Sequence, residues 1–425
     1  MNSILISAVS SNQGKTILST ALLYYFKKSV RPFKIGPDYI DPQFHEIVCN
    51  TKSINLDTFI MNEPQVKWLF NKYSNKEVSI LEGVMGFYDG MDKGCSAYDV
   101  GKLLNTPTVL LLDASGSYIT ISAVLKGLKT YKEDNTIKAV VLNKVSSKMH
   151  FELIKKQIEQ DFQGENEVKV LGWIKKDLPS LRDTHLGLDL KDAKKEVLEN
   201  ISKEVLENID LETLKKITTY KKEAITNYPF EEIKKINKKA TVVYDENFSF
   251  LYHDNLETLK ELFNEIELIS STKDERICSD SDLVFIPGGY VETNEAYERV
   301  KTSQNFKASL IEHANKNKHI YAECAGLLYL SNSVDDKEMT KILKVSFSLD
   351  SKRVRLGYYH SQSGLKGHAF HYTKPLDTSL GCDILSKKIN SKGEVGAWKK
   401  KNVYGTYLHT MFRNNINILK DYFGI

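Results

Sequence analysis

Residues 3–18 read "SILISAVSSNQGKTIL" and decide the fold class. The first seven are apolar or small and predict a β-strand, after which apolar residues recur along one face of a helix. Gly14, Lys15 and Thr16 lie between these two elements. Backbone N–H groups at a helix start can hold phosphate oxygens, with Lys15 at the terminal phosphates and the Thr16 hydroxyl on magnesium. Although Val9 replaces the first glycine of the standard loop, we predict nucleotide binding.

Short β-branched runs alternate with helical patterns through roughly the first 180 residues, which predicts an α/β domain with helices on the faces of a parallel sheet. The expected strands are 3–9, 31–36, 77–83, 107–114, 138–144 and 167–174. A second alternating region, residues 240–412, predicts a second α/β domain. Between them, the Lys/Glu-rich tract 188–239 has leucines at helical spacing. We interpret it as a solvated helical connector, with a binding role as the alternative.

Composition narrows the possible functions. The chain has 425 residues, 41% hydrophobic and 27% charged, which is typical of a soluble protein with two or three domains. A net charge of +4 with scattered lysines does not indicate nucleic-acid binding. No apolar run reaches the ~20 residues of a membrane span, and the N-terminus lacks the basic start of a signal peptide. Five widely spaced cysteines favour the reducing cytoplasm.

Two acidic loops follow predicted strands, where open α/β sheets bind ligands. "KIGPDYIDPQFH" (34–45) carries Lys34, Asp38, Tyr39 and Asp41, and "SILEGVMGFYDG" (79–90) carries Glu82 and Asp89. A carboxylate directly after a buried strand is a plausible magnesium ligand. The alternative is a pair of turns with solvated carboxylates. Asn143 ends another strand on the same edge, so we expect it either to contact the nucleotide base or to cap a turn.

Cys324 stands between a predicted strand and a predicted helix in "HIYAECAGLLYL" (319–330). A thiol on such a turn is exposed to substrate, and as a nucleophile it needs a base and an oxyanion hole. His409 follows a later β-like run and is the candidate base. The amides of Ala325 and of Gly288 or Gly289 are the candidate oxyanion donors. A buried, inert cysteine is the alternative.

Several motifs, in order along nearly the whole chain, resemble the cobyrinic acid a,c-diamide synthase family. They are "SSNQGKT" (10–16), "KIGPDYIDPQFH" (34–45), "NLDTF" (55–59), "EGVMGFYDG" (82–90), "PGGYVE" (287–292), "YAECAGLLYL" (321–330), "RLGYYH" (355–360), "GHAFHYT" (367–373) and "YLH" (407–409). The resemblance implies an ATP-dependent amidoligase domain related to dethiobiotin synthetase (1–187), the connector (188–239) and a class I-like glutamine amidotransferase domain (240–425).

The family's reaction, as the resemblance implies it, takes ammonia from glutamine and joins it to two acetate carboxylates of cobyrinate through acyl phosphates. Together with the residue chemistry above, it gives five sets of site residues. They are Cys324 and His409 for catalysis; Asp38, Tyr39, Ile40, Asp41, Glu82 and Asp89 for the synthetase site; Asn12, Gly14, Lys15, Thr16, Lys34 and Asn143 for the nucleotide; Gly288, Gly289 and Ala325 for the oxyanion; and Thr16, Asp41 and Glu82 for magnesium.

Four positions depart from the family's pattern. Asn12 and Ala325 replace usual glycines, Val291 replaces a proline and Ala369 an acidic residue. Ala325 keeps its backbone N–H, so we still expect an oxyanion hole. His409 lacks the Pro-Glu that follows it in ordinary class I glutaminases, which leaves a Cys-His dyad with an unassigned third member.

The acceptor stays open at this point. Relatives with similar motifs amidate nickel sirohydrochlorin or hydrogenobyrinic acid, and a regulatory P-loop ATPase with a degenerate second domain is the alternative from another class. The expected partners are cobyrinate, L-glutamine and ATP, without nucleic acid or membrane. The resemblance also leaves open a homodimer, the ammonia route, and the roles of His368 and His371.

Overall fold

The computed structural model describes residues 1–425 except 165–166, 179–182, 185–186, 189–193, 224 and 226. It divides into two compact units, Met1–Pro229 and Phe230–Ile425. Within the described residues, every helix is too short or too polar to span a lipid bilayer.

Unit 1 is built on a parallel sheet of seven described strands in the order β3-β2-β4-β1-β5-β6-β7. The strands are β1 (Asn2–Ala8), β2 (Val30–Ile35), β3 (Ile54–Leu56), β4 (Val78–Glu82), β5 (Thr108–Asp113), β6 (Ile137–Val145) and β7 (Lys169–Lys175), with a separate pair β8 (Asp183–Thr184) and β9 (Gly187–Leu188). All six strands predicted from the sequence of this unit are present. Their apolar runs are buried on both faces of the sheet, as expected of parallel strands.

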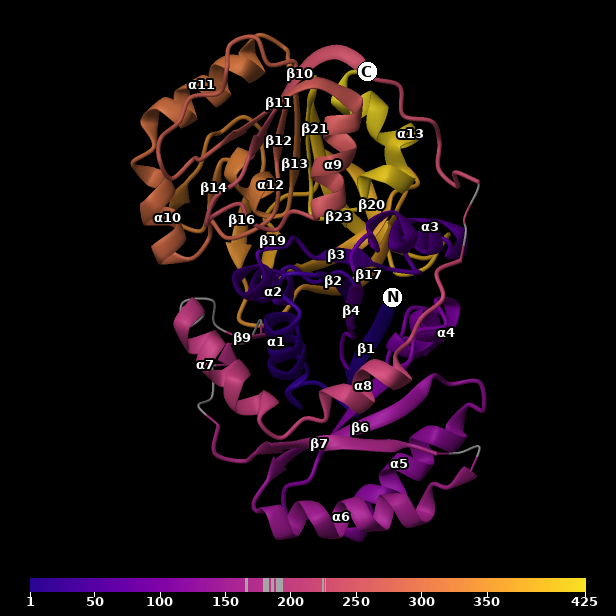
Figure 1. Ribbon diagram of the computed structural model, residues 1–425. Coiled ribbons are helices and arrows are strands. Elements are labelled where there is room, and N and C mark those ends of the chain that lie inside the picture. Colours follow the sequence, from indigo (N-terminus) through magenta and orange to yellow (C-terminus); the bar gives the residue numbers. More distant parts are fainter. Residues whose placement is uncertain (165–166, 179–182, 185–186, 189–193, 224, 226) are drawn as a thin grey trace. The chain divides into compact units, whose positions relative to one another are not determined.

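Helices cover both faces of this sheet, with α1, α2 and α7 together on one of them (Figure 1). The helices are α1 (Lys15–Tyr25), α2 (Asp41–Cys49), α3 (Glu63–Tyr73), η1 (Met91–Lys93), α4 (Ala97–Leu103), α5 (Ile119–Tyr131), α6 (Lys148–Asp161), α7 (Lys195–Leu206) and α8 (Leu211–Ile217). The tract predicted as a connector contributes α7 and α8, whose Leu198, Val205 and Leu214 are buried in the core of unit 1. Residues 189–193, 224 and 226 of that tract lie outside the described residues.

Unit 2 contains a mixed sheet in the order β11-β10-β12-β13-β22-β21-β20-β17-β18-β23. The first five strands of this order are parallel, and the pairs from β22 onward are antiparallel. The strands are β10 (Ile236–Val243), β11 (Phe263–Ile269), β12 (Leu283–Ile286), β13 (His319–Glu323), β17 (Arg355–Ser361), β18 (Lys366–His371), β20 (Gly381–Ser386), β21 (Glu394–Lys400), β22 (Val403–Thr406) and β23 (His409–Thr410), with a small sheet of β14 (Ser333–Val334), β15 (Lys337–Glu338), β16 (Ser346–Leu349) and β19 (Thr373–Pro375).

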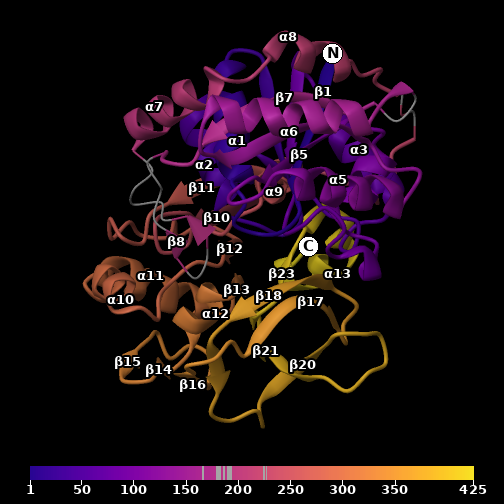
Figure 2. The same cartoon turned by 90° about the horizontal axis from the view of Figure 1, so that it is seen from below.

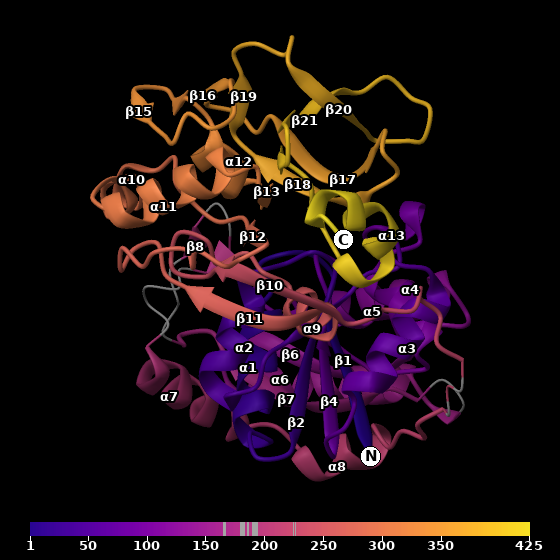
Figure 3. The ribbon, with the colours of Figure 1, turned by 90° about the horizontal axis from the view of Figure 1, so that it is seen from above.

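The helices of unit 2 form two groups. They are α9 (His253–Leu262), α10 (Asn294–Lys301), α11 (Gln304–Asn315), α12 (Ala325–Leu330) and α13 (Phe412–Phe423). Figures 2 and 3 show α10, α11 and α12 gathered together, whereas α9 packs against α13. Because α11, α12 and α13 all contact β13, this strand is covered on both sides and its carboxyl end is fixed in a dry core.

Candidate active sites

The loop between β1 and α1 in unit 1 is shaped for close approach to a ligand. Gly14 is left-handed (φ 88°) directly before α1, and Asn12 is also left-handed (φ 60°). A Cβ at Gly14 would lie 2.7 Å from Nδ2 of Asn143, so the position requires glycine. The start of α1 has no side-chain cap, which lets its first amides serve an anion.

Lys15 and Thr16 occupy the first turn of α1. Nζ of Lys15 donates to the carbonyl of Ser10 at 3.0 Å, so the side chain folds back over the loop. Burial, followed by the charge of Lys34, lowers the pKa of Lys15 to about 8. Oγ1 of Thr16 lies 2.8 Å from Oε1 of Glu82 and 3.2 Å from Oδ1 of Asp41. The starts of α1 and α2 and the end of β4 thus contribute to a single site.

Lys34 is the centre of this site. Its side chain is 2% exposed, and its ammonium contacts Asp41, Oε1 of Glu82 at 3.1 Å and Oδ2 of Asp38 at 3.6 Å. It also donates to the carbonyl of Gly83 at 3.3 Å. An isolated buried charge would be strongly unfavourable, so the three surrounding carboxylates offset the cost of burying this cation.

The carboxylates of this cluster have opposite proton affinities. Burial opposes ionisation of Glu82, but the charges of Lys34 and His45 hold its pKa well below the usual range. Burial, with the neighbouring charge of Asp38, raises the pKa of Asp41 well above its usual value. Burial alone would lower the pKa of Lys34, yet the surrounding carboxylates raise it. Glu82 therefore stays ionised, and Asp41 is the first of the two to take up a proton as the pH falls.

The other predicted residues of the synthetase site serve mainly through the backbone. Oδ1 of Asp38 accepts from the amides of Ile40 (2.8 Å) and Asp41 (3.2 Å), which fixes the start of α2. The carbonyl of Tyr39 accepts from Gln43 at 2.9 Å. Oδ2 of Asp89 accepts from the amide of Gly86 at 2.8 Å and so braces the turn after β4. Asp38, Asp41 and Glu82 are brought together at Lys34; Asp89 is held nearby.

Sequence reasoning missed His45. Its ring is 1% exposed, with Nε2 at 2.9 Å from Oε2 of Glu82 and Nδ1 at 3.2 Å from Oγ of Ser53. His45 therefore holds the oxygen of Glu82 that does not face Lys34. A usable signal was present, since His45 lies one helical turn after Asp41 and shares its face of α2.

The oxygen atoms at this site are of the types that bind magnesium. Thr16, Asp41 and Glu82 offer a hydroxyl and two carboxylates, the ligand types that magnesium takes from proteins. Among the described residues, no group of three or more His, Cys, Asp or Glu is arranged to hold a metal ion by itself. Any ion here would share these carboxylates with the ammonium of Lys34 and would need further oxygens, such as those of a nucleotide.

Asn143 lies on β6 behind the loop. Its Nδ2 donates to the carbonyl of Gln13 at 2.8 Å, and its Oδ1 accepts from the amide of Lys144 at 2.8 Å. Both ends of the amide thus contact backbone. This arrangement favours a role in shaping the loop over direct contact with a base.

In unit 2, Cys324 sits on a strained turn between β13 and α12. Its backbone is left-handed (φ 47°, ψ −105°), an unusual conformation for a residue with a Cβ. The amide of Cys324 donates to the carbonyl of Thr406 at 2.8 Å, which ties the turn to β22. A Cβ at Gly326 would lie 2.4 Å from the carbonyl of Ile286, so α12 can approach β12 only with glycine there. The predicted strand and helix on either side of Cys324 are present, and its role as a nucleophile stays a prediction.

The sulfur of Cys324 is held in its neutral form. Burial, with the nearby charge of Glu292, raises the pKa of the thiol to about 12. The backbone amides of Ala325 and Gly289 act in the opposite direction and favour the thiolate. Both amides are among the predicted oxyanion donors, and that role stays a prediction.

His409 lies at the Gly288–Gly289 turn as well. A Cβ at Gly288 would lie 2.1 Å from Cε1 of His409, so glycine is needed to admit the ring. Gly288 thus makes room for the imidazole of His409, the predicted base. Nδ1 of His409 is 3.7 Å from Oε2 of Glu323, and burial lowers the pKa of the imidazole to about 3. Thiol and imidazole are both uncharged at rest.

Two further buried residues near this site were not predicted. Arg355 is 4% and His371 is 5% exposed, and both pack on the ring of Tyr407. Nη1 of Arg355 and Nε2 of His371 have no hydrogen-bond partner among the described residues. Tyr407 lies two residues before His409 in the chain, which places this group beside the site. His368 pairs with His409 across β18 and β23.

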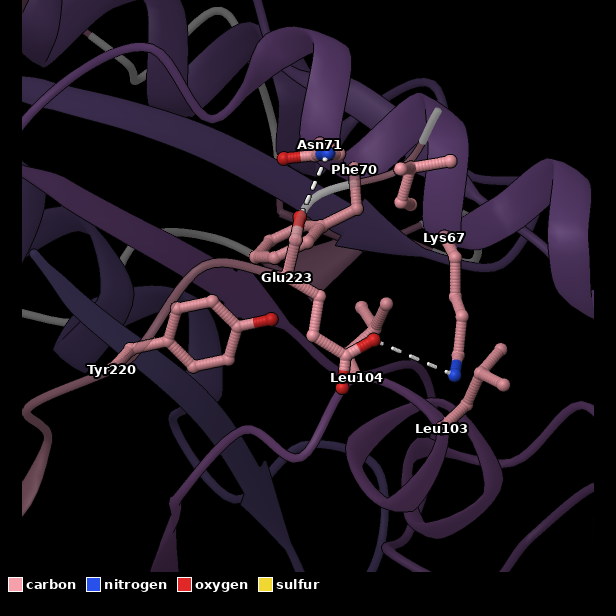
Figure 4. A pocket seen from close by; sticks show the side chains of 8 residues that line it. Lys67, Phe70, Asn71, Leu103, Leu104, Tyr220 and Glu223 are labelled. Atoms are coloured by element: carbon pink, nitrogen blue, oxygen red, sulfur yellow. Dashed lines mark hydrogen bonds and ion pairs between the residues drawn. The ribbon is translucent and has the colours of Figure 1, made fainter. Parts of the chain in front are cut away.

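The cavity drawn in Figure 4 lies in unit 1 and has no member among these site residues. Its lining consists of Lys67, Phe70, Asn71, Leu103, Leu104, Tyr220, Glu223 and Ile225. Glu223 contacts α3 through Nζ of Lys67 (3.8 Å) and Nδ2 of Asn71 (3.1 Å). With a volume of about 10 Å³ it has room for a single water, so we interpret it as a packing defect under the chain after α8.

Two family models match the chain, one in each unit. Residues 4–183 match the CobQ/CobB/MinD/ParA nucleotide binding domain, and residues 239–416 match the CobB/CobQ-like glutamine amidotransferase domain. The protein therefore belongs to the class that joins a nucleotide-binding α/β domain to a glutamine amidotransferase domain.

Relatives of known name narrow the class to a family. Proteins named cobyrinate a,c-diamide synthase are 33% identical in Caldanaerobacter subterraneus (95% of this chain, 94% of that protein) and 31% identical in Saccharolobus solfataricus (97% and 98%). The one from Fusobacterium nucleatum is 33% identical over 100% of both chains. The chain belongs to the cobyrinate a,c-diamide synthase family, which confirms the resemblance seen in its motifs.

Proposed function

We propose that this protein uses ATP and glutamine to convert the a and c acetate carboxylates of cobyrinate into primary amides. One observation carries the proposal: the likeness to proteins named cobyrinate a,c-diamide synthase extends over 95% or more of the chain and so spans both units. A likeness confined to one unit would have supported only a nucleotide-binding protein or only a glutaminase.

In the glutaminase step, Sγ of Cys324 attacks the side-chain amide carbon of glutamine. His409 accepts the thiol proton and delivers it to the departing nitrogen, which leaves as ammonia. Water then hydrolyses the thioester to glutamate. We assign the oxyanion to the amides of Gly289 and Ala325, and this is supported by their effect on the pKa of the neighbouring thiol. The buried guanidinium of Arg355 is our candidate for the carboxylate of glutamine.

In the synthetase step, a substrate carboxylate oxygen takes the terminal phosphoryl group of ATP, giving an acyl phosphate and ADP. Ammonia then attacks the acyl carbon and phosphate leaves. Lys15 would neutralise charge on the transferred group. Magnesium, when bound through Thr16, Asp41 and Glu82, would supply further positive charge at the phosphates. We assign the corrinoid side of the site to residues 38–41 and Asp89.

We place this reaction in the cytoplasm, since all five cysteines are free thiols. The test is a turnover assay with glutamine, ATP and a panel of cobyrinate, hydrogenobyrinate and nickel sirohydrochlorin. Mass spectrometry of the products counts the amidations. Two amidations of cobyrinate, faster than of the other two acids, are expected. Faster amidation of another acid would mean that this acid, and not cobyrinate, is the substrate. ATP hydrolysis without formation of any amide would refute the proposed ligase activity.

A further inference from the structure

Glu323 is a buried acid that neither site assignment uses. It is the last residue of β13, directly before Cys324, and is 1% exposed. Its two carboxyl oxygens have different surroundings. Oε1 accepts from the amide of Thr410 at 3.2 Å and from the hydroxyl of Tyr321 at 3.3 Å. Oε2 lies 3.7 Å from Nδ1 of His409.

We propose that Glu323 is the missing third member of the glutaminase group, a positioning residue that acts through His409. This inference rests on the proposed glutaminase reaction. With Oε1 anchored, Oε2 can accept a hydrogen bond from Nδ1–H of His409. That bond fixes the tautomer whose Nε2 is unprotonated, and only this tautomer can take the proton of Cys324 through Nε2.

The distance of 3.7 Å is longer than a hydrogen bond. Catalytic hydrogen bonds are often long in ligand-free proteins and tighten when substrate binds. A positive charge on His409 during the reaction would also favour the carboxylate form of Glu323. No acid directly follows His409, where the sequence continues Thr410-Met411-Phe412. The acid of the group therefore comes from another segment, the end of β13.

The test measures glutamine hydrolysis by Glu323→Ala, Glu323→Gln and Tyr321→Phe. For both Glu323 variants we expect kcat to fall on the order of 10²-fold, within the range of general-base catalysis, with KM little changed. Tyr321→Phe, the matched control, removes a contact to Oε1 and leaves Oε2, so kcat should stay within about threefold, the loss of one neutral hydrogen bond. An unchanged kcat in the Glu323 variants would overturn the proposal.

A double-mutant cycle separates positioning from mere packing. In a His409→Ala background, Glu323→Gln should cost no further activity, because its effect passes through the imidazole. Equal losses in both backgrounds, or a Glu323→Gln protein that does not fold, would assign Glu323 a structural role and overturn the inference. Wild-type protein that hydrolyses no glutamine would refute the proposed function itself, a result distinct from either.

Discussion

The two sites use charge in opposite ways. In unit 1, the buried ammonium of Lys34 contacts three carboxylates, and Glu82 is held as an anion. In unit 2, burial keeps Cys324 and His409 uncharged, with a pKa of about 12 for the thiol and about 3 for the imidazole. One site is ionised before any ligand arrives, and the other ionises only during its reaction.

This difference follows from what each site must bind. A nucleotide brings phosphate charge and a metal, so fixed countercharges in unit 1 stay useful throughout. Glutamine has a neutral side chain, and its amide acquires charge only as the thiol attacks. In the proposed reaction, the backbone amides of Gly289 and Ala325 would stabilise that charge, as side-chain charges would in unit 1. We therefore expect unit 1 to depend on individual charges and unit 2 on exact placement.

The largest effect should separate the two sites completely. Cys324→Ala removes the nucleophile, so glutamine-dependent amide synthesis should fall by at least about 10³-fold, towards the residual rate left without a nucleophile. Synthesis from added ammonium chloride should persist, because ammonia bypasses the thiol. Product mass with each nitrogen source is the measurement. Equal loss with both sources would contradict the assignment.

Lys15→Ala should produce the converse result. Without its ammonium, the transferred phosphoryl group loses a countercharge, and synthesis should drop on the order of 10²-fold with glutamine and with ammonia alike. Glutamine hydrolysis, measured as glutamate formed, should remain. Lys144→Ala is a matched control, since this lysine pairs with Asp113 outside the carboxylate cluster. Near wild-type synthesis by Lys15→Ala would remove the phosphate-loop assignment.

Lys34→Met tests whether the carboxylate cluster depends on its cation. The substitution keeps the length of the side chain but removes the cation that faces Asp41 and Glu82. Removing one partner of a buried ion pair costs about 3–5 kcal/mol, so we expect the free energy of unfolding to fall by this order. Denaturant titration is the measurement. The loss should shrink at low pH, where Asp41 becomes protonated. A pH-independent loss would mean that packing, not charge, is responsible.

Glu323→Gln tests how burial of an acid, without a cation beside it, makes the stability of unit 2 depend on pH. Burial raises the pKa of Glu323 to about 8, so the folded protein holds its proton while the unfolded chain releases it above about 4.5. Wild-type stability therefore falls as pH rises from 4.5 to 8, by at most about 1.4 kcal/mol per pH unit. Glutamine cannot ionise, so the variant should gain melting temperature relative to wild type across that window. A constant difference would contradict the raised pKa.

Local patterns were enough to predict much of the fold. The β-branched runs of unit 1 became strands. The helical stripe predicted after the first strand consists of Ile17, Leu18, Ala21, Leu22 and Tyr25; Leu18, Ala21 and Leu22 are buried and Ile17 is partly buried. Tyr25, on the same stripe, is 42% exposed, because it ends α1 at the surface beside Lys215. A stripe of apolar residues shows which face of a helix packs against the core. It does not show how far along that face the neighbouring elements extend.

The pairings at the sites could not be read from the sequence. Glu323 meets His409 only because β13 pairs with β22, and His45 meets Glu82 only because β2 lies beside β4. Strand order is a property of the whole sheet and leaves no local signature. The nucleophile turn was predictable for the opposite reason, since strand, cysteine and helix follow each other directly in "HIYAECAGLLYL".

The smallest effect concerns Asn143, whose side chain connects β6 to the phosphate loop. Its contacts to Gln13 and Lys144 predict that Asn143→Ala destabilises unit 1 by about 1 kcal/mol, the net value of a hydrogen bond or two. Loosening the loop should raise the KM for ATP severalfold without changing the preference for ATP over GTP or the rate of glutamine hydrolysis. Direct contact with the base would instead relax that preference. Steady-state kinetics with both nucleotides, together with denaturant unfolding, distinguishes the two roles. A loss of nucleotide selectivity at unchanged stability would show that Asn143 contacts the nucleotide. A loss of stability at unchanged selectivity would show that Asn143 shapes the loop.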